Sequence, residues 1–221
     1  MFWFKKKPPN WLPSDYPVYA APHVGMPWEL TDDQAKENFD YLLQNKQFRI
    51  EALANLLTKF DIDLQAGLSA ESPDQLLIEL HNWSGEYWHQ LPKSKAMANL
   101  SMQRDKDSHW FNSDCSGDDL IYSVITDTGI ALGEQLIRQM PSAYWSLVLD
   151  KEDVADKMLF AQRHLVLIPR NDGLTRHSRS DVILLAMDRY ASIDRFDHKY
   201  ANPWLMSAHG SIEIGIKGSS D

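Results

Sequence analysis

Apolar residues recur at steps of three and four along the first half of the chain, a period that is typical of amphipathic helices. The clearest stretch begins after Thr31, which together with Gln34 has the spacing of a capping box at a helix start. We predict one helix over residues 32–60, with Asn45 as the place where it could be interrupted. Its apolar positions are Phe39, Leu42, Leu43, Phe48, Ile50, Leu53, Leu56, Leu57 and Phe60.

The same period predicts two further helices, and prolines mark their ends. Ser72 and Pro73 start one of them, because proline is favoured at the first helical position and serine just before it. Pro92 ends this helix, since proline lacks the backbone donor that a helix interior needs. The other helix covers residues 117–140 and is stopped by Pro141.

Beyond residue 141 the apolar period changes from helical to alternating, which indicates strands. We predict strands at YWSLVLD (144–150), HLVLIPR (164–170) and SIEIGIK (211–217), and one more helix over residues 181–196. Helices come first and strands gather late in the chain. This order favours an α+β fold, in which a mostly helical N-terminal half packs on a small C-terminal β-sheet.

The first 30 residues have a different character, because residues 8–30 hold six of the 11 prolines. Proline fixes the backbone and lacks a donor, so this segment is neither a helix nor a central strand. It is nevertheless too rich in large aromatic residues for a disordered linker. These residues are Trp11, Tyr16, Tyr19 and Trp28. We expect residues 1–30 to form an extended arm that docks on the remainder of the protein.

Two glycines interrupt the predicted helix 117–140. Gly129 and Gly133 are four residues apart and therefore lie on one stripe of the helix. Each costs about 1 kcal/mol relative to alanine inside a helix. We expect this cost to be offset by close approach of an aromatic ring or a crossing helix. The alternative is that the glycines leave room for a ligand.

Length and charge narrow the possible functions. The chain has 221 residues, so we expect residues 1–221 to form a single domain that includes the arm. Its formal net charge of −9 disfavours nucleic acid, whose binding needs clustered Lys and Arg, and it permits a basic protein partner. The single cysteine suits a reducing compartment, and no apolar run is long enough for a membrane span. We therefore expect a cytoplasmic location.

Several motifs are incomplete, and each lacks residues that a cofactor or metal site would need. Glu86 and His89 have the Glu-x-x-His spacing of di-iron bundles, but that architecture needs a second such motif and two more glutamates. Residues 112–117 resemble the front of a calcium loop, but its bidentate glutamate is missing. Cys115 lies among acidic residues, which raise a thiol pKa and disfavour a nucleophile. We expect no cofactor, no metal and no catalytic residue from these motifs.

A few residues remain as candidates for binding. Basic side chains gather between residues 163 and 179 of an otherwise acidic chain, and we predict an exposed basic loop there, between the second strand and the next helix. Glu134 either faces solvent or holds an arginine. Trp83 and Trp145 are expected in the core. The candidate binding residues are Trp88, His89, Glu134, Arg170, Arg176 and Arg179.

One part of the chain resembles known proteins. The stretch FRIEALANLLTKFDIDLQAGLSAESPDQLLIELHNW, followed by DTGIALGEQLIRQMPSAYW, resembles uncharacterised bacterial domains of unknown function. In those domains a Ser-Pro/Leu/Trp helix precedes a Gly-Glu-Leu helix and a Trp-led strand. The resemblance covers about residues 40–150 and implies no catalytic residues. Some domains of that kind resemble components of toxin–immunity systems.

Two hypotheses for function follow. The first is a non-enzymatic, acidic, cytoplasmic binding or interaction protein, for example a toxin-neutralising immunity-type protein. The second is an enzyme or small-ligand binder whose pocket lies beside the helix that carries Gly129 and Gly133. A deep pocket with convergent polar groups would favour the second hypothesis, and a shallow acidic face would favour the first.

Overall fold

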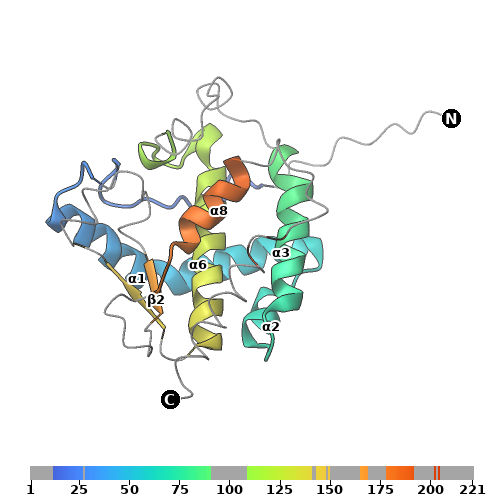
Figure 1. Cartoon of the computed structure of the whole chain (residues 1–221). Helices are drawn as coiled ribbons and strands as arrows, with labels where there is room; N and C mark the ends of the chain where they lie inside the picture. Colours follow the sequence, from blue (N-terminus) through green and yellow to red (C-terminus); the bar gives the residue numbers. More distant parts are fainter. Residues whose placement is uncertain are drawn as a thin grey trace, which may run out of the picture.

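Helices make up most of the structure (Figure 1), which confirms the helical part of the predicted fold class. The computed structural model describes residues 12–26, 28–90, 109–140, 143–147, 149, 165–168, 178–191, 202 and 204, with the backbone alone at residues 89, 165–168 and 178–180. Among these residues no helix is long and apolar enough to cross a membrane.

Helix α1, Asp32–Leu57, begins at the predicted capping box. Thr31 Oγ1 accepts from the backbone of Gln34, and the Gln34 side chain accepts in return from the backbone of Thr31. The predicted interruption near Asn45 is wrong. The Asn45 side chain donates to the carbonyl of Tyr41 at 2.8 Å and the helix continues. A 3₁₀ turn, η1 (Thr58–Phe60), ends the segment.

Two shorter helices follow α1. Helix α2, Leu64–Ser69, was not predicted, and Asp63 caps its start. Helix α3, Asp74–Tyr87, has Pro73 at its N-cap, one position before the predicted place, and continues as a 3₁₀ turn, η2 (Trp88–Gln90). The predicted end at Pro92 lies outside the described residues.

Helix α6, Ile121–Gln139, runs through the middle of the molecule (Figure 1) and is preceded by a 3₁₀ turn, η3 (Gly117–Asp119). These bounds confirm the predicted helix 117–140. Helix α8, Val182–Ala191, packs across α6, and α1 crosses α6 as well. Almost every side chain of α6 is buried, so this helix forms the centre of the apolar core.

Three short strands pair antiparallel in the order β1-β2-β3. Strand β1 is Tyr144–Ser146 and strand β2 is Leu165–Ile168, and both lie inside predicted strands. Strand β3, Ser178–Ser180, corrects the predicted loop, because the backbone of Arg179 is paired with Leu167 of β2. The predicted strand 211–217 lies outside the described residues.

The described part of the proline-rich arm packs against α1 and α6. Leu12, Tyr16, Tyr19 and Met26 are all buried. Asn38 of α1 holds the arm by two reciprocal bonds, since its side chain accepts from the backbone N–H of His23 and donates to the His23 carbonyl, at 2.9 and 2.8 Å. The arm is therefore extended but fixed.

Candidate functional site

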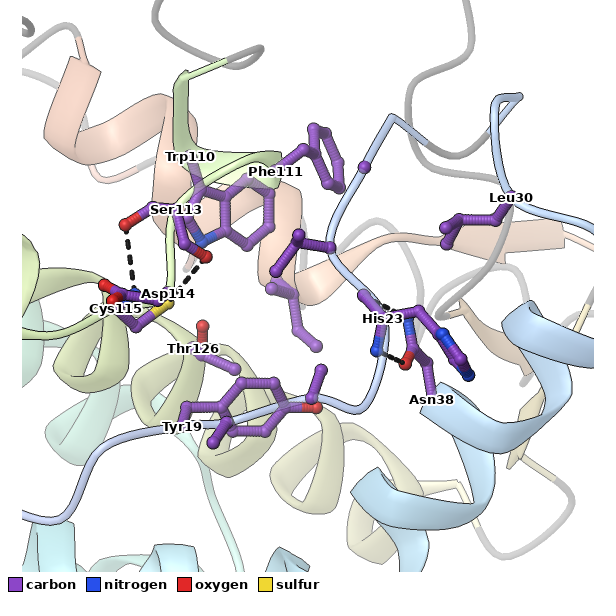
Figure 2. A pocket seen from close by; sticks show the side chains of 15 residues that line it. Tyr19, His23, Leu30, Asn38, Trp110, Phe111, Ser113, Asp114, Cys115 and Thr126 are labelled. Atoms are coloured by element: carbon purple, nitrogen blue, oxygen red, sulfur yellow. Dashed lines mark hydrogen bonds between the residues drawn. The ribbon is translucent and has the colours of Figure 1, made fainter.

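A cavity of about 160 Å³ lies where the arm, the segment before η3, and helices α6 and α8 meet (Figure 2). Its walls are mainly apolar and aromatic. Figure 2 shows Trp110 and Phe111 on one side of the cavity and Tyr19 on the other. Val24, Leu30 and Ile183, with Ala20 and Ala21 of the arm, complete the apolar lining.

Backbone hydrogen bonds fix the arm over this cavity. The N–H of Tyr19 donates to Ser123 Oγ of α6 at 2.8 Å. The N–H of Gly25 donates to the carbonyl of Phe111, also at 2.8 Å, and so ties the arm to the opposite wall. Gly25 has φ of +141°, a backbone conformation that residues other than glycine rarely adopt. The arm therefore covers the cavity and is hydrogen-bonded to the protein on both sides of it.

Thr126 supplies the distinctive polar group of the lining. This threonine of α6 is only 2 % exposed, and its side chain borders the cavity (Figure 2). Its hydroxyl has no hydrogen-bond partner among the residues that the structure describes. A helical threonine usually returns its hydroxyl to the carbonyl four residues earlier, as Thr128 does to Val124 at 2.8 Å. The free hydroxyl is thus available to whatever occupies the cavity.

Cys115 and Asp114 border the same end of the cavity as Thr126 (Figure 2). Burial raises the pKa of the Cys115 thiol to about 12, and the charges of Asp119 and Asp114 act in the same direction. The direction agrees with the sequence-based expectation, although burial is the larger cause. Asp114 accepts from the backbone and the hydroxyl of Ser116, and these bonds lower the pKa of its carboxyl. Near neutral pH the cavity therefore borders a thiol and a carboxylate.

A buried ion pair anchors the arm beneath the cavity. Asp127 follows Thr126 in α6 and is 0 % exposed, and Arg49 of α1 is 1 % exposed. Arg49 Nε and Nη2 donate to the two carboxylate oxygens at 2.7 and 2.8 Å, and the Tyr16 hydroxyl donates to the same carboxylate at 2.6 Å. Arg49 also donates to the carbonyls of Pro17 and Val18 in the arm. Every charged oxygen is thereby paired.

Burial disfavours the charge of Asp127, whereas its bonding partners favour it. Burial raises the pKa of this carboxyl to about 6, while the Arg49 charge and the Arg49 and Tyr16 hydrogen bonds act to lower it. With that pKa the carboxylate is ionised near neutral pH. The pair has the two-point geometry that makes arginine–carboxylate contacts strong and directional.

Trp88 and Glu134, two of the predicted binding residues, do not line this cavity. Trp88 is 0 % exposed and packs in an aromatic cluster with Trp83, Tyr190 and Trp204, which leaves no face for a partner. Glu134 holds no arginine among the described residues. It accepts from Lys46 Nζ and from the Trp145 indole, both at 2.6 Å.

The remaining candidates fall outside the described side chains. His89 lies in η2 and Arg179 lies in β3, but only their backbones are described. Arg170 and Arg176 lie outside the described residues altogether. Among the described residues, no group of three or more His, Cys, Asp and Glu side chains could hold a metal ion.

The two glycines are packed as predicted. A Cβ on Gly129 would lie 2.6 Å from the Cα of Ile183 in α8, and a Cβ on Gly133 would overlap the Trp145 ring. One glycine thus admits a crossing helix and the other admits an aromatic ring. The cavity borders α6 one turn earlier, at Thr126, so the space beside the glycines is filled by protein.

The sequence drew attention to Cys115 and Tyr19 but not to the other residues that build the site. Thr126, Trp110 and Phe111 carry no distinguishing local pattern. Asp127 did carry a signal, because a carboxylate in the middle of a buried helix needs a partner. No protein-family model, no curated protein and no solved structure matches this chain, so the cavity is interpreted from its own geometry.

Proposed function

We propose that the protein is a binding protein whose cavity receives a small, mostly apolar ligand with one hydrogen-bonding group. The observation that carries this proposal is the Thr126 hydroxyl, which borders the cavity (Figure 2) and has no hydrogen bond to another described residue. An entirely apolar ligand that covers this hydroxyl leaves it unpaired, at a cost of about 1–3 kcal/mol, whereas a ligand that bonds to Thr126 avoids this cost.

The size of the cavity limits the ligand. An engineered apolar cavity of about 150 Å³ is large enough for benzene, and this one measures about 160 Å³. A single ring or a short branched chain therefore fits without rearrangement. Trp110, Phe111 and Tyr19 offer ring surfaces that favour an aromatic ligand, because offset and edge-to-face ring pairs add to the energy of burial.

The chemistry of the lining supports binding over catalysis. A thiol with a pKa of about 12 stays protonated near neutral pH and is a poor nucleophile. His23, which also borders the cavity, has Nε2 2.5 Å from Glu37 Oε2 at the surface. These groups suit recognition of a ligand more than attack on one.

A matched pair of probes tests the proposal. Phenol and toluene have nearly the same shape, but only phenol can hydrogen-bond. Titrations followed by the methyl NMR signals of Thr126 and Ile183 should show saturable binding, with phenol about fivefold or more tighter than toluene, as expected for one buried hydrogen bond of about 1 kcal/mol.

The Thr126→Val variant should abolish the preference for phenol without abolishing toluene binding. Thr128→Val is the matched control, since Thr128 is buried in the same helix but bonds to Val124. If neither probe produces saturable shifts, or if Thr126→Val leaves the preference intact, the proposal is wrong.

We also propose that the whole chain has an α+β fold and a cytoplasmic location. The antiparallel pairing of β1, β2 and β3 supports a sheet in the C-terminal part. The single cysteine, which is free and buried, supports a reducing compartment.

A further inference from the structure

We propose that a second site, the groove between the arm and α1, docks an arginine side chain of a basic protein partner. The groove has a volume of about 420 Å³. It is separate from the cavity of Figure 2, and the two sites share no lining residue.

Helix geometry builds one wall of the groove. Phe48, Glu51, Ala52, Asn55 and Lys59 are spaced by three and four residues, so they form one stripe along α1 and its following turn. The stripe ends at the 3₁₀ turn that contains Lys59. The groove therefore runs along the helix axis and is open to solvent.

The arm builds the other wall. Pro13, Asp15, Tyr16 and Pro17 face the stripe. This wall is rigid, because Arg49 donates to the Pro17 carbonyl at 2.9 Å and Tyr16 is bonded to Asp127. Two of the four residues are prolines with a fixed φ, so docking costs little further backbone entropy.

An exposed aromatic ring lies in the groove. Phe48 is 52 % exposed although it is a large apolar residue. The protein already holds one guanidinium near this ring, since the Arg49 Cζ atom lies 6.0 Å from the Phe48 ring centroid. A guanidinium is planar and weakly hydrated, and it stacks well on aromatic faces. The exposed side of Phe48 offers the same kind of surface to a partner.

The charges in the groove complement an arginine. Asp15 and Glu51 are exposed, and among the described residues Asp15 makes no ion pair and Glu51 accepts one hydrogen bond, from Gln47 at 3.0 Å. These two carboxylates outweigh the ammonium of Lys59, which has no ion-pair partner in the described part of the chain. A guanidinium fork can reach carboxylates while its plane covers a ring, which a lysine ammonium does less well.

The surroundings favour a protein partner over a free cation. Beyond the groove the exposed face of α1 carries Asp33, Glu37 and Asp40 against Lys36. The whole chain has a net charge of −9. A field of this sign steers a basic surface towards α1 and raises its association rate.

The test uses the full chain and two blocked tripeptides, acetyl-Gly-Arg-Gly-amide and the same peptide with citrulline, which has nearly the same shape but no charge. Backbone amide shifts of Glu51, Ala52 and Asn55 are followed by NMR at low salt. We expect the arginine peptide to give saturable shifts at these amides in the millimolar range and the citrulline peptide to bind at least about fivefold more weakly.

Surface variants then locate the site. Asp15→Asn, Glu51→Gln and Phe48→Ala should each weaken the arginine peptide by about two- to fivefold, the range for exposed ion pairs and cation–π contacts. Lys59→Gln should tighten it, because it removes a like charge. Asp40→Asn is the matched control, since it removes the same charge from the same helix outside the groove, and it should change affinity by less than about 1.5-fold.

Three results would overturn this inference. Equal losses in Asp15→Asn and Asp40→Asn would mean that only the overall charge attracts the peptide. Equal binding of both peptides would mean that the groove takes an apolar occupant. Shifts that do not saturate would mean that the groove holds no site. Because Thr126→Val leaves the groove untouched, failure here is distinguishable from failure of the ligand cavity.

Discussion

Helix α6 meets its neighbours on two opposite faces that are built in opposite ways. One face carries Asp127, whose charge is matched by Arg49 and Tyr16. The other face, two residues further along and on the far side of the helix, carries Gly129 and Gly133, where α8 and Trp145 come closest. On one face a fully paired charge joins α6 to its neighbours, and on the other face the missing side chains of two glycines allow close packing.

The two faces should fail for different reasons. The polar face tolerates little change in charge, because a buried ion that loses its partner keeps its full cost of desolvation. The glycine face is indifferent to charge and intolerant of volume, because there is no space for one additional carbon. The following variants separate these two kinds of sensitivity, in order of expected effect.

Asp127→Ala should be the most damaging change. It leaves the buried guanidinium of Arg49 with only the two arm carbonyls, and breaking a buried pair in this way costs about 3–5 kcal/mol. Urea unfolding measures the loss, and limited proteolysis should show faster cleavage between residues 12 and 26. A loss below about 1 kcal/mol would mean that the pair does not hold the arm.

Gly129→Ala should lower the free energy of unfolding by about 1–3 kcal/mol. The added Cβ meets the backbone of Ile183, which cannot move without shifting α8, and this cost exceeds the gain of about 1 kcal/mol that alanine brings to a helix. An unchanged urea midpoint would contradict the packing account.

Gly133→Ala allows a more specific test of close packing, because the atoms that a new Cβ would meet belong to a side chain that can itself be replaced. Trp145→Leu removes the ring atoms that the new Cβ would overlap. A double-mutant cycle should therefore give a favourable coupling of about 0.5–3 kcal/mol between the two changes. Strict additivity would show that the ring is not what excludes the methyl group.

Tyr16→Phe should cost less, about 1.5 kcal/mol, the lower end of the range for a hydrogen bond to a charged group, since the ion pair stays intact. The change should be visible as a lower thermal midpoint. If the cost equals that of Asp127→Ala, the hydroxyl and not the guanidinium is the main partner of the carboxylate.

Lys46→Met should have the smallest effect, at most about 1 kcal/mol. Its bridge to Glu134 is partly exposed, with side chains 31 % and 25 % accessible, and the Trp145 indole still bonds to the same oxygen. The effect should vanish in high salt. A larger loss that persists in salt would place Lys46 in the core and not at its edge.

Local signals in the sequence predicted the elements well. The capping box at Thr31 and Gln34 and the proline after α6 act within a few residues, so they fix helix bounds without knowledge of the fold. The two glycines were also informative, because their cost demands a close neighbour wherever that neighbour comes from. The unpredicted α2 and β3 are short, and their sequence patterns are too brief to stand out.

The site depended on contacts that no local pattern encodes. Arg49 and Asp127 are 78 residues apart, and although Asp127 in an apolar helix calls for a partner, no local pattern identifies Arg49 as that partner. Thr126 and Thr128 are two residues apart in one buried helix, yet only the second bonds to its own helix. Glu134 was expected either to face solvent or to hold an arginine, and its partners are a lysine and an indole.

The bond from Tyr16 to Asp127 also sets an order of events during synthesis. The two residues are 111 positions apart, so Tyr16 leaves the ribosome long before its partner exists. At about 5–20 residues per second, the wait is roughly 5–20 s. Arg49 emerges much sooner, and its bonds to Pro17 and Val18 can hold the arm on α1 in the interval. The arm is thus made well before it can be bonded to α6, and its prolines keep it from forming a competing helix in the meantime.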